Sequence, residues 1–169
     1  HSPIIRDLLD WNEPHSFFRI PSGLGQGLGI ALGTKLGARE RPVAMLIGDG
    51  SFLYNPVLPC LTFSKDQNLP ILIVIFNNNK YEVMRRTHLN WYPEGVSASE
   101  KLHYGVHIPN PDYSELARWT GGTGIRVDKP AELKNALAQA YAGVQSGKTA
   151  IVNIMLNEDR KSTRLNSSH

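Results

Sequence analysis

The stretch that decides the fold is Val43-Ala-Met-Leu-Ile-Gly-Asp-Gly-Ser51, a short apolar run that ends in two glycines around an acid. A second run, Ile71-Leu-Ile-Val-Ile-Phe76, ends in the polar triplet Asn77-Asn78-Asn79. Continuous apolar runs of this length are typical of strands that are buried on both faces of a parallel sheet. The carboxyl ends of such strands meet at one edge, where open α/β sheets bind ligands. The sequence therefore predicts a ligand site at that edge.

The rest of the chain alternates strand and helix patterns. Further strands are expected over residues 124–127 and 149–155, and helices over about 25–36, 55–65, 113–119 and 130–144. Asn55 is expected to cap its helix with Pro56 as first helical residue, and Asp112 to cap the next helix. Trp119 and Tyr141 are expected in the core. This alternation predicts an α/β fold, doubly wound, with a mainly parallel sheet and helices on both faces.

Composition excludes several classes of protein. The net charge of +3 comes from Arg160, Lys161 and Arg164, because residues 1–159 hold 15 basic and 15 acidic side chains. With no basic cluster elsewhere, nucleic-acid binding is not expected. The longest apolar run has six residues, far short of the roughly 18 of a membrane span. One cysteine, Cys60, excludes an internal disulfide framework and fits a reducing compartment, so the expected location is cytoplasmic.

The two ends of the sequence predict a fragment of a longer chain. The chain starts at His1 without Met, and residues 160–169 are polar and without periodicity. This tail resembles a translated cloning adaptor, and we expect it to be non-native or disordered. Residues 1–159 are then expected to form one cofactor-binding domain, since this length suits a single domain.

The chemistry of Gly48-Asp49-Gly50-Ser51 points to a phosphate and a cation. Glycines let a backbone approach a diphosphate, and the amides of Gly50 and Ser51 could donate hydrogen bonds to it. Asp49 would repel that anion unless a divalent ion, such as Mg²⁺, lay between them, and Asn78 could reach the same ion. Taken separately, the glycine motif could be a turn and the Asn triplet a loop. The spacing of the earlier glycines, Gly23 to Gly33, fits no dinucleotide fingerprint.

Gly48-Asp49-Gly50, followed after 26 residues by Asn77-Asn78, resembles the cofactor motif of thiamine-diphosphate-dependent enzymes of the acetolactate synthase, pyruvate oxidase and benzoylformate decarboxylase group. The resemblance extends from about residue 14 to residue 156 and includes the glycine-rich stretch 22–33. It implies that thiamine diphosphate and Mg²⁺ are the cofactors. Asn79 and Glu82 stand where this family commonly has Gly.

The resemblance also assigns roles to single residues. It implies that Asp49, the side-chain carbonyl of Asn78 and the backbone oxygen of Lys80 ligate the magnesium ion, since an ammonium group cannot. The diphosphate would be held by residues of the same edge, namely Gly48, Gly50, Ser51 and Tyr81. The other end of the cofactor would meet the carbonyl of Ser22, Gly23 and Leu24, whose apolar side chain would support the bent shape of the cofactor.

In this family the glutamate that activates the cofactor lies on a separate pyrimidine-binding domain, of the same or a second subunit. The expected function is therefore the diphosphate-side half of a 2-oxo acid decarboxylase or acetolactate-synthase-like enzyme, a lyase or transferase, with no catalytic residue in this chain and no activity alone. The complete enzyme is expected to be a homodimer or homotetramer. Two alternatives remain: a complete subunit of a two-subunit decarboxylase, and a non-catalytic nucleotide-binding α/β module.

One further segment could contribute to the site. Residues 85–111 are expected to be mobile and could cover the cofactor, and they contain His88, His103 and His107. Their spacing suits no zinc motif, so surface or loop roles are favoured.

Overall fold

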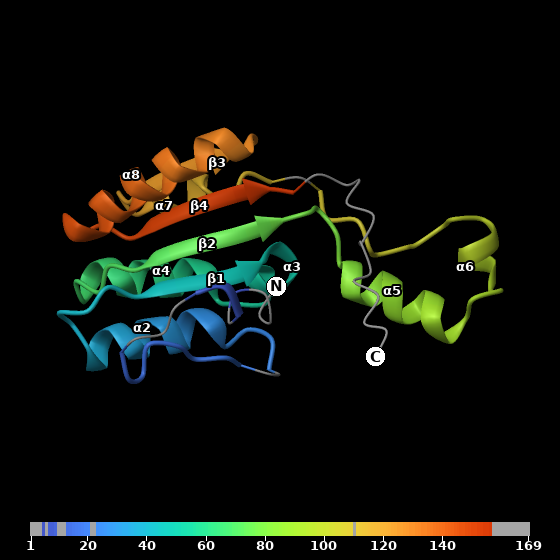
Figure 1. Cartoon of the computed structure of the whole chain (residues 1–169), viewed down its shortest axis with the longest axis horizontal. Helices are drawn as coiled ribbons and strands as arrows, with labels where there is room; N and C mark the ends of the chain where they lie inside the picture. The colour runs from blue at the N-terminus through green and yellow to red at the C-terminus, as the bar shows by residue number, and fades with distance from the viewer. Residues whose placement is uncertain (1–4, 6, 10–12, 21–22, 110, 157–169) are drawn as a thin grey trace.

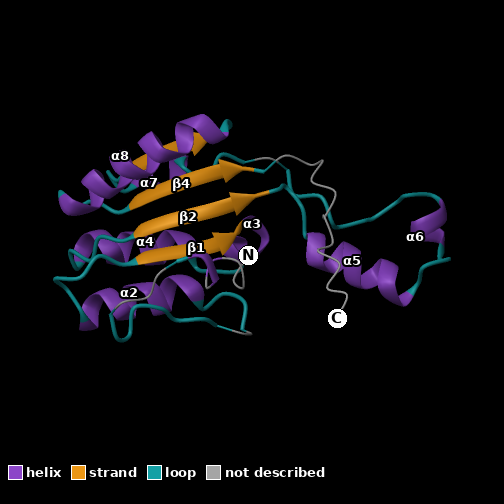
Figure 2. Cartoon of the chain, in the orientation of Figure 1, coloured by secondary structure: helices purple, strands orange, loops and turns teal. Residues whose placement is uncertain are grey.

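The computed structural model describes residues 5, 7–9, 13–20, 23–109 and 111–156. Its described part is built on a sheet of four parallel strands in the order β1-β2-β4-β3 (Figure 2). The strands are β1 (Ala44–Gly48), β2 (Leu72–Asn77), β3 (Thr123–Val127) and β4 (Ala150–Met155). They fall on the four runs expected from the sequence, so the parallel α/β fold is confirmed.

The register of the strands brings their carboxyl ends to one edge. Ala44 lies opposite Leu72, so Gly48 at the end of β1 lies opposite Phe76 near the end of β2. The next residues along these two strands are Asp49 and Asn77. The topology therefore places the acid that follows β1 and the Asn triplet that begins at the last residue of β2 side by side.

Helices α2 (Gly27–Gly37), α3 (Asp49–Leu53), α4 (Val57–Asp66) and α7 (Glu115–Trp119) pack on one face of the sheet. They bury apolar side chains against alternate residues of the strands, as expected where side chains alternate between the two faces. The core on this face contains Leu28, Leu32, Met45, Phe52, Leu61, Ile73, Ile75, Tyr113, Ala117 and Ile151.

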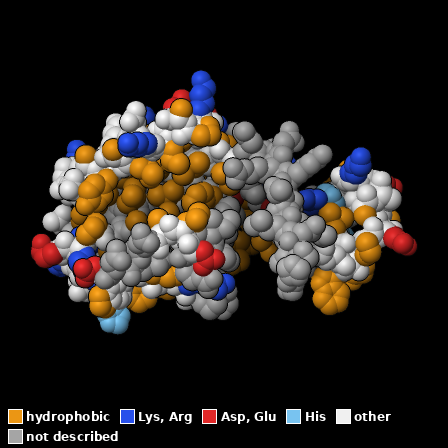
Figure 3. Space-filling model, in the orientation of Figure 1, with side chains coloured by type: hydrophobic (Ala, Val, Ile, Leu, Met, Phe, Trp, Pro, Cys, Tyr) orange, Lys and Arg blue, Asp and Glu red, His pale blue; other side chains and the backbone are white. Residues whose placement is uncertain are grey.

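Helix α8 (Leu133–Gln145), preceded by the 3₁₀ turn η1 (Pro130–Glu132), covers part of the opposite face. Its small residues allow a close approach to β3 and β4, with a core of Val127, Ala136, Ala140, Val144, Ala150 and Val152. Helices therefore lie on both faces, as predicted. On β1 the side of the sheet that carries Leu46 stays exposed, and Figure 3 shows hydrophobic side chains gathered over the strands.

Helices α5 (Glu82–Trp91) and α6 (Val96–Ser99) belong to an excursion of the chain that we call the arm, residues 82–107. Neither helix contains a buried residue. The arm extends beyond the carboxyl ends of β1 and β2 and away from the other helices (Figure 1). The segment that could cover the site is thus partly helical and points outward.

Several local expectations are wrong. Helix α7 begins at Glu115 with Ser114 at its N-cap, so Asp112 does not cap it. Helix α4 begins at Val57, with Pro56 at its N-cap, because the side chain of Asn55 makes hydrogen bonds elsewhere. Trp119 and Tyr141 are 63% and 41% exposed, since each lies on the outer side of its helix. The expectation for residues 160–169 falls outside the described residues. Within the described part, no helix has the length and apolarity that a membrane span needs.

Candidate functional site

Asp49 is the acid at the centre of the candidate site. It follows Gly48 directly, at the point where β1 ends and α3 begins, and the residue is only 3% exposed. Burial raises the pKa of its carboxyl above the ordinary value, and the backbone N–H groups of Gly50, Asn79 and Lys80 oppose part of that shift. The carboxylate oxygen Oδ2 is buried and has no hydrogen-bond partner. A buried acceptor without a partner is what a cation ligand requires.

The loop after β2 faces this carboxylate. Two of its side chains fold back on the backbone: Asn77 Oδ1 accepts a hydrogen bond from the N–H of Asn79 at 3.0 Å, and Asn78 Oδ1 from that of Lys80 at 3.1 Å. Asn79 adopts a φ of 55°, in the left-handed region that Asn tolerates better than most residues. The loop therefore holds an Asn in a backbone conformation that favours glycine.

A short backbone pairing connects this loop to the end of the arm. Lys80 pairs with His107 in an isolated antiparallel bridge. The N–H of Tyr81 donates to the carbonyl of Val106 at 2.8 Å, and that of Ile108 donates to the carbonyl of Asn79 at 2.8 Å. Both bonds are made by residues next to the bridging pair. The pairing fixes where the arm leaves and rejoins the domain.

Tyr81 packs on the first turn of α3. A Cβ atom on Gly50 would stand 2.8 Å from the Tyr81 ring, closer than real contacts allow. Gly50 is therefore required for this close approach. The Tyr81 ring also meets Tyr54 edge-on, with 6.2 Å between the ring centroids. These contacts join the loop after β2 to the segment after β1.

The glycine-rich segment approaches the same region through the end of α3. Gly23 and Gly25 have φ values of 89° and 91°, and a Cβ on Gly25 would stand 2.6 Å from the carbonyl oxygen of Tyr54. Asn55 Oδ1 accepts a hydrogen bond from the N–H of Leu28 at 2.9 Å, in the first turn of α2. Leu24, between the two glycines, is 63% exposed. The expected role of Ser22 falls outside the described residues.

Comparison with known proteins identifies the family. Residues 1–154 match the model described as "Thiamine pyrophosphate enzyme, C-terminal TPP binding domain". The chain belongs to this family of thiamine pyrophosphate enzymes. The resemblance stated from the glycine and Asn motifs is therefore confirmed.

Similar proteins include several thiamine pyrophosphate enzymes. A probable 2-ketoarginine decarboxylase of Pseudomonas aeruginosa is 35% identical over 129 residues, which are 76% of this chain and 21% of that protein. The acetolactate synthase large subunit of Mycobacterium tuberculosis is 35% identical over 78% of this chain and 22% of its own length. The crystal structure of benzoylformate decarboxylase from Polynucleobacter necessarius matches with a TM-score of 0.69 and 25% identity, covering 90% of this chain and 28% of that one. The chain thus spans between a fifth and a third of these relatives.

The structure gathers most of the predicted site residues of this TPP binding domain. Asp49, Gly50, Asn78, Lys80 and Tyr81 lie in one cluster through the contacts described above. Gly48 and Ser51 flank the acid in sequence, and Gly23 and Leu24 are tied to it through the end of α3.

Sequence reasoning missed several supporting residues. Asn55 had been assigned to its own helix, and nothing local in the sequence links it to α2. Tyr113 packs edge-on against Phe52, with 5.4 Å between the ring centroids. Its burial, and to a smaller extent the negative charge of Asp49, raise the pKa of its hydroxyl to about 12. Asn153 of β4 is fully buried on the same face. A polar residue inside the otherwise apolar run 149–155 was the available signal.

Proposed function

We propose that the chain holds the diphosphate of thiamine diphosphate through a magnesium ion bound by Asp49, the side-chain carbonyl of Asn78 and the backbone carbonyl of Lys80. The observation that carries this proposal is the buried, unpartnered Oδ2 of Asp49. A carboxylate at 3% exposure gains most from a hard divalent cation, which prefers oxygen ligands shared with phosphates. Burial raises the pKa of this carboxyl, and a bound cation would favour its ionised form.

The diphosphate would lie on the backbone of Gly48, Gly50 and Ser51. The absence of a side chain at Gly50 leaves room for the Tyr81 ring, which would close one side of the diphosphate site. At the other end of the cofactor we place Ser22, Gly23 and Leu24. The exposure of Leu24 supports this assignment, because a Leu side chain that is 63% exposed has apolar surface to offer to a ligand.

For the longer protein, we propose a decarboxylase or acetolactate-synthase-like enzyme that acts on a 2-oxo acid in the cytoplasm. When bound, thiamine diphosphate supplies the electron sink on which carbon dioxide can leave. The residues of this chain would orient the cofactor and neutralise its diphosphate. The activating glutamate would come from elsewhere, so residues 1–159 would form the diphosphate-side domain and be inactive alone.

We further propose that the missing half is a pyrimidine-binding domain of the same or a second subunit, within a homodimer or homotetramer. An apolar groove of about 460 Å³ between α2 and α4 supports such packing, since its lining includes Leu32, Leu36, Cys60 and Phe63. Apolar surfaces of this kind are typical of contacts between domains or subunits. The match to a TPP binding domain favours this function over a nucleotide-binding module.

Calorimetric titration of thiamine diphosphate into the chain, with and without magnesium, tests the proposal. We expect binding that requires magnesium and is lost in Asp49→Asn, which keeps the size of the side chain and removes its charge. Asp66→Asn, at an exposed position of α4, is the matched control and should bind like the wild type. Equal binding without magnesium, or tighter binding of adenine nucleotides, would overturn the proposal. Decarboxylation of a 2-oxo acid by the chain alone would contradict its assignment as half of a site.

A further inference from the structure

Three buried side chains behind the candidate site each keep one polar atom without a partner. They are Nδ2 of Asn77, Oη of Tyr113 and Oδ1 of Asn153, in residues that are 0%, 2% and 0% exposed. We propose that these three atoms bind an internal water molecule, and that Tyr113 and Asn153 act through it as positioning residues for the loop after β2. The binding of water stands on the fold alone, whereas its effect on the cofactor rests on the proposed function.

The topology brings the three side chains to one face of the sheet. Ile75 of β2 lies opposite Asn153 of β4, and Asn77 is two residues further along β2, so both Asn side chains point to the same face. Ile75, Ile151 and Tyr113 belong to the core on that face. Neighbouring strands lie about 4.8 Å apart and two residues span about 6.6 Å along a strand, so the Cα atoms of these two Asn residues are about 8 Å apart. One water can bridge short amides at this separation.

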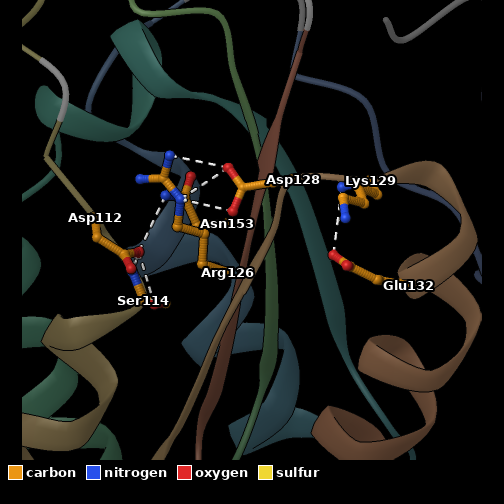
Figure 4. A network of polar contacts seen from close by, with 7 residues as sticks. All are labelled: Asp112, Ser114, Arg126, Asp128, Lys129, Glu132 and Asn153. Atoms are coloured by element: carbon orange, nitrogen blue, oxygen red, sulfur yellow. Dashed lines mark hydrogen bonds and ion pairs between the residues drawn. The ribbon is translucent and has the colours of Figure 1, made fainter.

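Tyr113 is fixed close to Asn153 by its own neighbours. Asp112, which precedes it, accepts hydrogen bonds from the hydroxyl of Ser114 at 2.7 Å and from Nδ2 of Asn153 at 3.2 Å (Figure 4). Burial alone would raise the pKa of Asp112. The hydrogen bonds donated by Ser114, and to a smaller extent by Asn153, instead hold that pKa below its ordinary value. Asp112 therefore stays ionised and holds the start of α7 on β4.

The hydrogen-bond partners fix which atom of each amide is left over. Asn77 Oδ1 accepts from the N–H of Asn79, so its free atom is the donor Nδ2. Asn153 Nδ2 donates to the carboxylate of Asp112, which can only accept, so its free atom is the acceptor Oδ1. One donor, one acceptor and one hydroxyl match the bonding pattern of water. A cation would be repelled by the N–H of Asn77, and an anion would be repelled by the carbonyl of Asn153.

Hydration is also the favoured state of these atoms. Leaving a buried polar atom without a partner costs more than immobilising a water that satisfies several such atoms at once. Internal waters in proteins typically make about three hydrogen bonds to buried polar groups. The proposed water would bond to three such groups.

The water would act on the candidate site through Asn77. This residue holds the N–H of Asn79 with one amide atom and would hold the water with the other. Tyr113 and Asn153 would thus restrain the turn that presents Asn78 and Lys80 to Asp49. Partners of this outer kind typically change metal affinity by about ten-fold or more when they are removed.

A crystal structure of the full 169-residue chain without cofactor, at a resolution that shows ordered water, tests the first part. We expect one water at about 2.7–3.2 Å from Asn77 Nδ2, Tyr113 Oη and Asn153 Oδ1. A dry site, or direct hydrogen bonds among the three side chains, would overturn the inference. This result does not depend on whether the chain binds thiamine diphosphate.

The positioning role is tested with Tyr113→Phe, which removes only the hydroxyl. At a temperature where both proteins are fully folded, the magnesium-dependent affinity for thiamine diphosphate should fall about ten-fold. Tyr141→Phe, at a half-exposed position on α8, is the control and should leave the affinity unchanged. A lower melting temperature with unchanged affinity would show a structural role only and would overturn the positioning role. If the wild type binds no thiamine diphosphate, the proposed function fails and the crystallographic water alone decides the inference.

Discussion

Replacing Asn55 with Ala should remove the connection between the glycine-rich segment and the acid-bearing turn. Asn55 is 7% exposed, and its Oδ1 accepts from the N–H of Leu28 at 2.9 Å. Its Nδ2 donates to the carbonyls of Ser51 at 3.0 Å and Phe52 at 3.2 Å. No side chain from the helix's own N-cap residue, Gln26, makes a capping hydrogen bond to α2, so Asn55 supplies that cap from a distance.

The expected loss of stability follows from these three hydrogen bonds. Each contributes about 1 kcal/mol, and the N–H of Leu28 would be left buried without an acceptor. A total of about 3 kcal/mol corresponds to a fall of about 6–12 °C in melting temperature for a domain of this size. Urea unfolding followed by circular dichroism measures the change in free energy of unfolding.

Two comparisons make this prediction specific. Asn90→Ala, at an exposed position of α5, should change stability by less than about 0.5 kcal/mol. Asn55→Asp keeps the acceptor for Leu28 but places a carboxylate against two carbonyls, so it should be as destabilising as the Ala variant at pH 7. A loss below about 1 kcal/mol in Asn55→Ala would refute the view that this side chain caps α2.

Three further perturbations have defined outcomes. Gly25→Ala, at φ 91° and with its Cβ 2.6 Å from the Tyr54 carbonyl, should cost at least about 2 kcal/mol in chemical unfolding. Glu82 has a pKa lowered to about 2, first through its hydrogen bond to Arg85, so its contribution is present above its ordinary value of 4.5 and is lost as pH falls toward 2. The ion pairs of Glu82 with Arg85 and Arg86 are partly exposed, so Glu82→Gln should lower the stability of α5 by only about 1 kcal/mol at pH 7. This loss should appear as roughly five-fold faster hydrogen exchange of the α5 amides. Burial raises the pKa of Asp49, so without metal the stability that its protonated carboxyl contributes is lost as pH rises through that pKa. At pH 7, Asp49→Asn should therefore unfold at a higher urea concentration than the wild type, and its stability should no longer show this pH dependence.

Matched variants serve as controls for these three. Gly29→Ala, inside α2 with no atom within 4 Å of the new Cβ, should stabilise by about 0.5–1 kcal/mol. Glu94→Gln, exposed on the arm, should leave α5 exchange unchanged. Three results would contradict these predictions. They are a Gly25→Ala variant as stable as the wild type, hydrogen exchange of the α5 amides in Glu82→Gln equal to that of the wild type at pH 7, and an Asp49→Asn variant less stable than the wild type at pH 7.

The sequence was sufficient to predict the sheet and the edge that carries the candidate site. Strands with continuous apolar runs, such as Ile71 to Phe76, have no competing interpretation once they are short and followed by polar loops. The position of Asp49 beside the Asn triplet then follows from parallel pairing alone. These features depend on apolar runs that are each continuous in the sequence, and on the pairing of two strands that follow one another along the chain.

The supporting contacts could not be predicted in this way. Local rules assign Asn55 to the helix it precedes, because Asn before Pro is a good helix start, whereas the structure uses its side chain 27 residues away. The shared location of Tyr113 and Asn153 depends on β4 lying between β2 and β3, which no local pattern states. The left-handed conformation of Asn79 likewise depends on the loop around it.

The pairing of Lys80 with His107 gives the arm a single point of departure and return. Because α5 and α6 bury nothing against the sheet, the segment between these two residues can change in length or composition without moving β2 or the acid of β1. The arm can therefore be exchanged as a cassette, by recombination or by design, while the edge of the sheet is retained.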